Sequence, residues 1–515
     1  MTSVTVYDGT NTIGGNKIYV EENNRGLFLD FGMNFKKYNY FFQEYLTERP
    51  ARGIYDLFHL DLIPKLNIYR EDLTPSDLNL SRCPKLAIDA VLISHPHMDH
   101  FGNIGLLKTD IPIVASPITF ALIKGMADSS NLSLNLQAIY YQEKLRDKSG
   151  FILESEKGKN KKYKTRKLVC IDPISDAFKS FITTNIKGAA DRSSGLLKPL
   201  ECEDLSDLST NPTQFDIKAY EVDHSIYGAT AYILRGDTTI AYTGDFRLHG
   251  KNAHKSEHFI RSAKDASVLI IEGTRASRED INESEETVYN SCLNVISQAW
   301  NLVVADFSAR NFERLETFKD IGKKTNRQVV IPAKQAYLLR ALEQIDNVDR
   351  TSDILVYEEK KSTTNKWEEN FLKGEISYIE SETIARNPGN YILCFSFYEV
   401  KHLLDVRPEQ GTYIYSSSEA FDEESEFDFV RLSNWLNHFN FKIHGFKMVD
   451  KNGLIKPEFS KGFHASGHAS KSDLIHAIET IDPDYIIPVH TENPNWFKEQ
   501  FDNARLCKEE EKIRF

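Results

Sequence analysis

Short apolar runs recur along the chain, and several of them end at a single polar residue. Four such runs, each written with the polar residue that closes it, are Leu27–Asp30, Ala90–His95, Ile240–Asp245 and Tyr485–His490. Apolar runs of this length that are bounded by turn signals are typical of buried strands. We therefore predict strands whose ends carry histidine or aspartate side chains.

Between residues 276 and 455 the apolar runs alternate with segments of helical length. We predict strands at 302–305, 328–331, 391–394 and 412–415, and helices at 284–300, 311–325, 333–345 and 426–438. Ser284 suits the N-cap of the first helix, and Glu285 and Glu286 suit the positive end of its dipole. Strands that alternate with helices of this length indicate βαβ units and a parallel sheet. The block is expected to be a separate α/β domain inserted into the domain around it.

Length and composition indicate a globular chain with more than one core. A chain of 515 residues is too long for a single core, so two or three domains are expected. With 41% apolar and 27% charged residues it resembles soluble proteins, and no apolar run is long enough to span a bilayer. The N-terminus lacks a signal pattern, and the six cysteines are scattered. We expect a cytoplasmic protein with reduced thiols and no cysteine-based zinc site.

A dense group of potential metal ligands follows the strand expected at 90–93. It reads Ser94-His-Pro-His-Met-Asp-His100, and histidine makes up only 15 of the 515 residues. Neutral imidazole and carboxylate are groups that bind zinc and similar divalent metals. In an extended chain His95, His97 and Asp99 point to one side and His100 to the other. The loop is therefore expected to offer ligands to two neighbouring ions.

More potential ligands stand at the ends of other expected strands, namely His224, Asp245, His490 and Asp30. Rigid strands hold such side chains in place, and the loops after them expose the site. One isolated histidine of this kind is more often structural. The whole set, spread over several strand ends, indicates a metal centre.

These motifs resemble the metallo-β-lactamase fold: His-x-His-x-Asp-His, then a lone His, then Thr-Gly-Asp ending at Asp245. The segment Phe463–Ser470, with His490 following 22 positions after His468, resembles the β-CASP nucleases. That branch includes ribonuclease J and the cleavage and polyadenylation endonuclease. The resemblance implies an α/β fold, a metallo-β-lactamase αββα sandwich formed by residues 1–275 and 456–515. A β-CASP α/β domain at 276–455 would be inserted into it.

The resemblance also implies a pair of metal ions, expected to be two Zn²⁺, with Mn²⁺ as the alternative. One ion would be held by His95, His97 and His224, the other by Asp99, His100 and His490, with Asp245 bridging them. Two metals about 3.5–4 Å apart activate water and bind a phosphate oxygen. Asp30 is expected to orient a ligand histidine by a hydrogen bond.

The expected catalytic residues are His468, Glu272 and Asp99. His468 would stabilise charge or protonate the leaving 3′-oxygen, and Glu272 beside it would raise the pKa of the imidazole and hold its orientation. His464 is the alternative to His468. The candidate phosphate contacts are Ser466, Gly467, Ser470, Ser308 and Arg310, the last two where ribonuclease J recognises a 5′-monophosphate.

By the resemblance, His490 favours RNA over DNA. The expected activity is zinc-dependent hydrolysis of single-stranded RNA, endonucleolytic or 5′-to-3′ exonucleolytic, in RNA processing or decay. The alternatives are a hydrolase of a small thioester or lactone, a β-CASP DNA nuclease, and a silent binding subunit. By the resemblance, the chain is expected to lack the additional C-terminal domain of many ribonuclease J proteins, and a homodimer is one option for its assembly.

The net charge of −12 is not what is expected of a protein that binds RNA, which is itself negatively charged. Phosphate contacts depend on local patches rather than on the total. One basic stretch, 157–167, has seven Lys or Arg among eleven residues, and we interpret it as a solvated loop or hairpin tip, with RNA contact as the alternative. It lies in a long insertion, 130–212, to which the sequence assigns no role.

Overall fold

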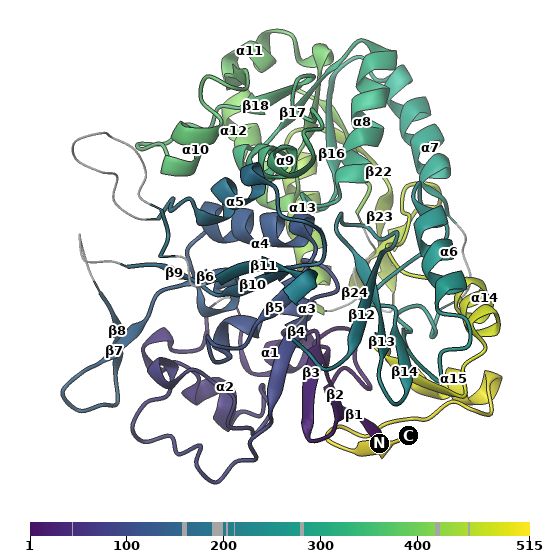
Figure 1. The fold of residues 1–515 in the computed structure, drawn as a ribbon. Coiled ribbons are helices and arrows are strands. Elements are labelled where there is room, and N and C mark those ends of the chain that lie inside the picture. Colours follow the sequence, from purple (N-terminus) through teal and green to yellow (C-terminus); the bar gives the residue numbers. More distant parts are fainter. Residues whose placement is uncertain are drawn as a thin grey trace.

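Three main β-sheets organise the chain in a computed structural model (Figure 1). The structure describes residues 1–43, 45–156, 162–187, 199–201, 204–210, 212–278, 283–417, 423–451 and 454–515, with the backbone alone for 423–427. No helix within these ranges combines the length and apolarity needed to cross a bilayer. The α-helices are α1 (Phe35–Phe41), α2 (Tyr55–His59), α3 (Met98–Phe101), α4 (Pro117–Ser129), α5 (Asp176–Thr183), α6 (Ala253–Ser262), α7 (Glu285–Gln298), α8 (Phe312–Thr325), α9 (Ala333–Asp346), α10 (Lys366–Phe371), α11 (Ser381–Arg386), α12 (Leu403–Val406), α13 (Glu423–His438), α14 (Lys471–Ile481) and α15 (Pro494–Gln500).

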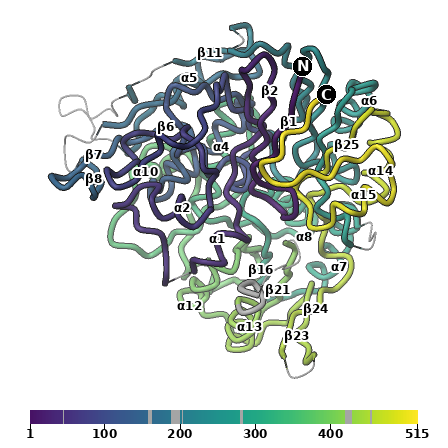
Figure 2. Tube along the Cα trace, turned by 90° about the horizontal axis from the view of Figure 1, so that it is seen from below, coloured from purple at the N-terminus to yellow at the C-terminus, as the bar shows by residue number. Residues whose placement is uncertain are grey.

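The first sheet combines an antiparallel N-terminal part with a parallel part. From edge to edge its strands are β11 (Asp204–Asp207), β10 (Lys167–Cys170), β5 (Ile113–Ala115), β4 (Ile88–Leu92), β3 (Arg25–Leu29), β2 (Lys17–Glu22), β1 (Thr2–Asp8) and β26 (Lys512–Arg514). Strands β1 to β3 pair antiparallel, and β3, β4, β5, β10 and β11 pair parallel. Because β26 pairs with β1, the two chain ends lie side by side (Figure 2).

The second sheet stacks on the first. Its strands run in the order β12 (Asp216–Glu221), β13 (Thr230–Arg235), β14 (Thr239–Tyr242), β15 (Val268–Glu272) and β25 (Tyr485–Val489). Fully buried side chains from both sheets, such as Val20, Leu92 and Leu234, share one hydrophobic cluster between the sheets. Helices α6, α14 and α15 pack on the outer face of the second sheet. With α4 on the outer face of the first sheet, the layers follow the αββα order implied by the resemblance.

The third sheet lies between Leu302 and His444 and is parallel throughout. Its strands are β19 (Tyr378–Ile379), β18 (Ile354–Tyr357), β17 (Gln328–Ile331), β20 (Tyr391–Cys394), β16 (Leu302–Asp306), β21 (Gly411–Tyr415) and β22 (Phe441–His444). All its pairings are parallel, as the alternation of strands and helices predicted. We call residues 285–444 the inserted unit; the domain boundaries at 275 and 456 stay a prediction. Two-stranded ladders are formed by β23 (Phe446–Lys451) with β24 (Leu454–Phe459), β6 (Tyr140–Tyr141) with β9 (Lys164–Thr165), and β7 (Lys144–Arg146) with β8 (Leu153–Ser155).

The four helices and four strands predicted in the inserted unit are present, with ends that shift by a few residues. Ser284 caps α7 as predicted, because its side chain accepts a hydrogen bond from the amide of Thr287. The sequence prediction omitted β18, β19, β22 and the short helices α10 to α12. Strand β18 is the clearest omission, since its apolar run carries the same signal as the strands that were predicted.

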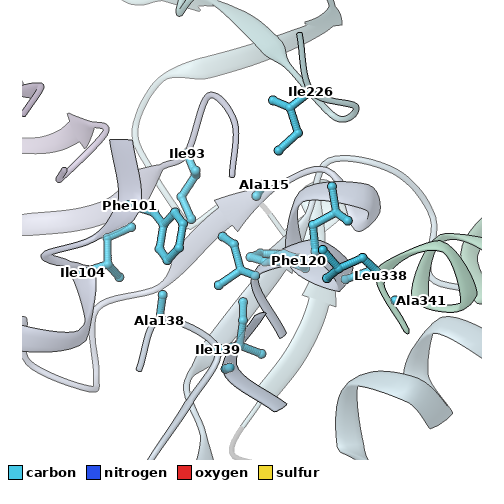
Figure 3. Packing of buried hydrophobic residues seen from close by; sticks show 14 of the residues in the cluster. Ile93, Phe101, Ile104, Ala115, Phe120, Ala138, Ile139, Ile226, Leu338 and Ala341 are labelled. Atoms are coloured by element: carbon cyan, nitrogen blue, oxygen red, sulfur yellow. The ribbon is translucent and has the colours of Figure 1, made fainter. Parts of the chain in front are cut away.

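The inserted unit is held against the first sheet by contact between α4 and α9. Phe120 of α4 and Leu338 and Ala341 of α9 belong to one buried cluster (Figure 3). Gly125 lets the two helices approach closely, because a Cβ there would lie 2.7 Å from the side chain of Leu338. Because α4 and α9 pack closely, the inserted unit is held in one position relative to the sandwich.

The sequence assigned no role to the segment 130–212; where it is described, it forms part of the first sheet and of the packing around it. It supplies β10 and β11, which extend the parallel side of the first sheet. Its helix α5 packs toward the inserted unit, since the ring of Phe181 lies 6.3 Å from that of Phe371. The sequence prediction omitted both strands, although Leu168–Ile171 is an apolar run like those that were predicted.

The basic stretch 157–167, interpreted as a solvated loop or hairpin tip, contains a buried arginine. Residues 157–161 lie outside the described residues. Arg166 is fully buried, and its guanidinium donates hydrogen bonds of 2.8 Å to the carbonyls of Leu107 and Lys108. The solvated interpretation is therefore wrong for Arg166, which serves the packing of the first domain.

Asp306, at the end of β16, generates a prediction about stability. Burial raises its pKa to about 7, although the hydrogen bond from Tyr413 acts in the opposite direction. A carboxyl group whose pKa is raised by folding stabilises the protein fully below its ordinary pKa of 3.8 and loses that contribution as pH rises through about 7. We expect Asp306→Asn to raise the thermal unfolding temperature relative to wild type far more at about pH 8 than at about pH 5.

Thermal unfolding of both proteins across this pH range checks the prediction. Asp353→Asn is the control, because Asp353 is half exposed and paired with Lys323, which lowers its pKa. A stability difference between Asp306→Asn and wild type that does not vary with pH would contradict the prediction.

Candidate metal centre

The predicted metal ligands meet where loops from both sheets of the sandwich converge. They follow β4 (residues 95, 97, 99 and 100), β12 (His224), β14 (Asp245) and β25 (His490). His95, His100, His224, Asp245 and His490 are all buried. The side chain of Asp99 remains 21% exposed, so the centre opens to solvent on that side.

Three histidines form the first group. The Nε2 atom of His95 lies 2.9 Å from Nδ1 of His97, and Nε2 of His224 lies 3.3 Å from the same atom. All three offer one ring nitrogen within 4.8 Å of the others. This is the trio expected to share one ion.

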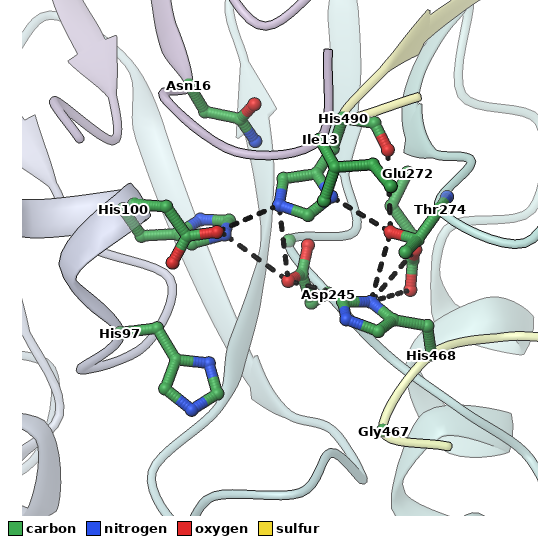
Figure 4. A network of polar contacts seen from close by, with 12 residues as sticks. Ile13, Asn16, His97, His100, Asp245, Glu272, Thr274, Gly467, His468 and His490 are labelled. Carbon is green, nitrogen blue, oxygen red and sulfur yellow. Dashed lines mark hydrogen bonds and ion pairs between the residues drawn. The ribbon is translucent and has the colours of Figure 1, made fainter. Parts of the chain in front are cut away.

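The second group consists of Asp99, His100 and His490, whose potential ligand atoms also lie within 4.8 Å of one another. The Nε2 atom of His490 lies 3.2 Å from Oδ2 of Asp99. Asp245 stands between the two groups. Its Oδ2 atom is 3.2 Å from Nε2 of His100 and 3.7 Å from Nε2 of His490 (Figure 4). The same atom is 3.7 Å from Nε2 of His95. One carboxylate thus reaches members of both trios.

The electrostatics of the cluster separate neutral imidazoles from charged carboxylates. Burial lowers the pKa of His95 and His97 well below its usual value, and burial together with His468 lowers the pKa of His224 to about 4. Burial opposes the charge of Asp245, yet neighbouring histidines such as His490 hold its pKa well below its usual value. Neutral imidazole and ionised carboxylate are the forms that bind metals.

His100 differs from the first trio. Burial alone would lower its pKa, but the carboxylates of Asp245 and Asp99 raise it well above the usual value. The surroundings of His100 therefore favour positive charge. Two buried atoms here, Nε2 of His100 and Oδ1 of Asp245, have no hydrogen-bond partner in the described part of the chain. Buried polar atoms are almost always paired, so unpaired nitrogen and oxygen donors in this environment fit a cation.

Two family models match parts of the chain. Residues 65–123 match the metallo-beta-lactamase superfamily, and residues 455–510 match the Zn-dependent metallo-hydrolase RNA specificity domain. A solved protein of unknown function from Enterococcus faecalis superposes with a TM-score of 0.65 at 21% identity, with 99% of both chains covered. The chain has a metallo-β-lactamase fold.

The sequence relatives of this metallo-β-lactamase-fold chain include ribonucleases. It is 24% identical to ribonuclease J 2 of Staphylococcus saprophyticus over 293 residues, which make up 56% of this chain and 45% of that protein. It is also 24% identical to ribonuclease J 2 of Staphylococcus aureus over 291 residues, with the same shares of 56% and 45%. The chain spans about half the length of the curated relatives it matches. Together with the donor set, the metallo-hydrolase matches imply a metal cofactor at the centre.

The conformation of the motif differs from the extended chain expected from its sequence. The backbone turns helical at Met98, so Asp99 and His100 lie in the first turn of α3. The alternation argument is therefore wrong. Consecutive helical residues point about 100° apart, and here Asp99 and His100 both reach the second group. Gly14 permits this, because a Cβ there would lie 2.7 Å from the Asp99 side chain.

Asp30 lies where the sequence predicted, hydrogen-bonded to a histidine of the centre. Its Oδ2 atom is 2.7 Å from Nδ1 of His100, and it also accepts hydrogen bonds from Ser94 and Tyr242. The Ser94 hydroxyl lies 3.0 Å from Nδ1 of His95. Hydrogen bonds to the second ring nitrogen fix the orientation of a ligand histidine. Sequence reasoning did not assign Ser94 or Tyr242 to this task, because neither residue type marks it.

Thr274 is the most important residue that sequence reasoning missed. Its hydroxyl lies 2.9 Å from Nδ1 of His490 and 3.1 Å from Nδ1 of His468 (Figure 4). It therefore connects a histidine of the second group with the expected catalytic histidine. A threonine two residues after the end of a buried strand carries no signal of its own in the sequence.

His468 stands at the exposed edge of the centre, opposite the buried ligands. Its Nδ1 atom lies 3.1 and 3.2 Å from the two oxygens of Glu272, and its side chain is 23% exposed. Burial lowers the pKa of His468, but the carboxylates of Glu272 and Asp245 outweigh this effect and raise it. The described residues form no hydrogen bond with its Nε2 atom. His468 could also count as a fourth ligand beside Asp245, Glu272 and His490, although Glu272 and Thr274 already occupy Nδ1.

His464 does not face the centre, so it is excluded as the alternative to His468. Its Nδ1 and Nε2 atoms lie 2.9 and 2.7 Å from the backbone carbonyls of Ser417 and Gly445. Both ring nitrogens are therefore used to hold the loop against the inserted unit.

The five candidate phosphate contacts have different surroundings. Ser470 is fully buried and caps α14 by accepting a hydrogen bond from the amide of Asp473, so the expectation for its hydroxyl is wrong. The Ser466 hydroxyl accepts from the amide of His468, and the Gly467 carbonyl lies 2.5 Å from Nδ1 of His224. Both shape the loop around His468.

Arg310 and Ser308 come from the loop after β16 in the inserted unit. The pKa of His97 is lowered first by burial, then by His224 and then by the guanidinium of Arg310. Burial also lowers the pKa of Arg310, and the carboxylate of Asp99 opposes that effect. Its guanidinium is thus near the centre, and it makes no ion pair among the described residues; its one hydrogen bond there is to Met126 Sδ at 3.5 Å. Ser308 is exposed, and its carbonyl accepts a hydrogen bond of 2.8 Å from the amide of Asn311.

Thr274→Val should weaken metal binding although Thr274 is not a ligand. Valine keeps the shape of the side chain and removes the hydroxyl beside His490, so the imidazole loses its orienting partner. Loss of such a partner typically lowers metal affinity by about 10–100-fold. Competition with a chromophoric chelator measures the affinity, and Thr274→Ser, which keeps the hydroxyl, is the matched control. Equal affinities in the valine variant and wild type would remove Thr274 from the centre.

Proposed function

We propose that the protein is a two-zinc ribonuclease that hydrolyses phosphodiester bonds of single-stranded RNA, with Mn²⁺ as an alternative metal. The observation that carries the proposal is the position of Asp245 between two trios of potential ligands, with His468 at the exposed edge. The ribonuclease J 2 relatives and the match to an RNA specificity domain at 455–510, which contains His468 and His490, support RNA as the substrate.

The first ion would be held by His95, His97 and His224 and the second by Asp99, His100 and His490, with Asp245 contacting both. When bound, such a metal pair lowers the pKa of a coordinated water and neutralises charge on the phosphate oxygens. Asp99 is the one ligand whose carboxylate is partly exposed. We assign it the further task of accepting a hydrogen bond from the attacking water and so directing it at phosphorus.

His468 acts on the leaving group. As water attacks, the bond between phosphorus and the 3′-oxygen breaks, and the proton on Nε2 of His468 passes to that oxygen. The products are a 3′-hydroxyl and a 5′-phosphate, and the proton lost by water restores the acid. Glu272 holds Nδ1 through the 3.1 Å contact, so Nε2 points away from the strand end. An acid positioned in this way typically accelerates a reaction by about 10²–10⁴-fold.

Arg310 is proposed to bind a phosphate of the RNA backbone, and Ser308 is the weaker candidate beside it. A guanidinium near the centre that forms no ion pair with a carboxylate of the described chain suits a phosphate, which it binds through two parallel N–H groups. Because Arg310 belongs to the inserted unit, a bound strand would contact both the sandwich and the inserted unit. A small thioester or lactone would make no use of this cation.

His468→Ala and His490→Ala should separate catalysis from metal binding. His468→Ala is expected to keep the metal content of wild type and lose about 10²–10⁴-fold in rate. His490→Ala removes a ligand and should lose metal as well as activity. Glu272→Gln should act in the same direction as His468→Ala, but more mildly.

Metal content by mass spectrometry, measured beside the hydrolysis rate, checks these variants. His464→Ala is the matched control, since its ring nitrogens bond only to backbone carbonyls. If His468→Ala loses a metal ion, or stays fully active, the assignment of His468 as the acid is wrong.

The substrate class is tested with end-labelled oligonucleotides. Single-stranded RNA should be degraded faster than duplex RNA or single-stranded DNA, and a chelator should abolish the reaction. Labels on 5′-triphosphate, 5′-monophosphate and 5′-hydroxyl RNA distinguish internal cleavage from 5′-to-3′ digestion by product size. Equal rates on single-stranded DNA would contradict RNA specificity and indicate a DNA nuclease. Turnover of thioesters or lactones without nuclease activity would contradict the proposal as a whole.

A further inference from the structure

Arg247 is a fully buried cation two residues after Asp245, and it contacts three carboxylates. Asp223, which precedes His224, lies 3.3 Å from Nε. The other two come from the inserted unit: Glu285, at the start of α7, lies 3.2 Å from Nη1, and Glu313, in the first turn of α8, contacts Nη2. Arg247 therefore joins the sandwich to the inserted unit immediately behind the metal centre.

We propose that Arg247, together with Glu285 and Glu313, is a positioning device through which the inserted unit sets the geometry of the metal centre. The device acts on the Ser466–Gly467 peptide, and through it on His224 and His468. The inference rests on the metal centre of the proposed function, but not on RNA being the substrate.

The link to the centre runs through two consecutive carbonyl groups. Nη1 of Arg247 donates a hydrogen bond of 3.1 Å to the carbonyl of Ser466. The next carbonyl, that of Gly467, accepts from Nδ1 of His224 at 2.5 Å. The two carbonyls belong to adjacent peptide planes that meet at the Cα of Gly467, so the two hydrogen bonds hold the same short segment. The hydrogen bond at Nδ1 fixes the ring of His224 so that Nε2 faces His97.

The same loop carries His468, one residue beyond Gly467. The amide of His468 donates to the Ser466 hydroxyl at 3.1 Å, and the ring meets Glu272 only if the loop stays in this position. A displacement of the Ser466 carbonyl would thus move a metal ligand and the proposed acid together.

The link to the inserted unit is equally specific. Burial opposes the charge of Glu285, but Arg314 and Arg247 lower its pKa to about 2. Arg314 contacts both oxygens of Glu285 at 3.0 Å and also reaches the carbonyl of Phe463 at 3.5 Å. The second carboxylate, Glu313, accepts from the amide of Lys251 at 2.8 Å. The inserted unit therefore contacts the start of the 463–468 loop directly through Arg314, and it reaches Ser466 through Arg247 of the sandwich.

The shape of arginine suits this position. Its planar fork presents several N–H groups in fixed directions, so one side chain serves carboxylates from different segments and a carbonyl at once. Lysine has a single nitrogen and cannot reach all of these acceptors. If Arg247 served only stability, its hydrogen bond would not need to reach the Ser466 carbonyl. That carbonyl precedes the Gly467 carbonyl, which orients His224.

Glu313→Gln and Arg247→Lys in the full chain test the inference. Glu313→Gln removes a charge from the inserted unit while keeping its shape, and Glu313 touches neither metal ligands nor substrate. We expect both variants to lower zinc affinity by about 10–100-fold, the usual effect of losing a group that orients a ligand. They should also change the visible absorption spectrum of the Co²⁺-loaded protein and lower kcat more than they raise KM.

Arg327→Lys is the matched control. Arg327 is a buried arginine of the inserted unit that donates to the carbonyls of Ala299, Asn301 and Tyr391 and has no contact with the 463–468 loop. We expect it to lower the thermal unfolding temperature and leave zinc affinity and the Co²⁺ spectrum unchanged. If Arg247→Lys does not fold, Glu313→Gln decides the outcome.

Unchanged zinc affinity and an unchanged Co²⁺ spectrum in Glu313→Gln would overturn the inference, as would an equal loss of affinity in Arg327→Lys. Because zinc affinity is measured without RNA, the two proposals can fail separately. A wild-type protein that binds zinc but leaves RNA intact would contradict the proposed function alone. A wild-type protein that binds no divalent metal would contradict both.

Discussion

Asp245 lies within reach of both groups of histidines, and the architecture around it depends on keeping that carboxylate buried and charged. Its Oδ2 atom is 3.2 to 3.7 Å from four imidazole nitrogens, and Asp99 and Asp30 lie against the same histidine, His100. Buried carboxylates are costly unless positive charge compensates them. The loops of both sheets must therefore meet at one point, and the whole sandwich serves to bring them together.

The inserted unit completes the centre rather than merely covering it. Contact of α9 with α4 fixes its position, and Arg247 and Arg314 bind its carboxylates to the loop that carries His468. Asp99 and His468, which are assigned to the water and the leaving group, are partly exposed, and so is His97. The other members of the centre are buried, namely His95, His100, His224, Asp245 and His490.

Much of this could be predicted from the sequence, because apolar runs that end in histidine or aspartate reveal strand ends and ligand types together. The seven predicted ligands come together, and so does Asp30. Conformation was harder: Met98 starts a helical turn, which the spacing of the motif does not reveal. The sequence did not reveal the roles of Thr274 and Arg247, because their partners in the centre lie more than 200 residues away. It also missed the capping role of Ser470, whose partner is a backbone amide three residues further on. Pairings set by tertiary structure leave no periodic trace in the chain.

The position of the metals tests the account most directly. Crystals of the zinc-loaded protein should show, in anomalous difference maps above and below the zinc absorption edge, two peaks about 3.5–4 Å apart. Both should lie within bonding distance of Asp245, one beside His95, His97 and His224 and the other beside Asp99, His100 and His490. A single peak, or a metal bound by Glu272 and His468 in place of the second trio, would contradict it.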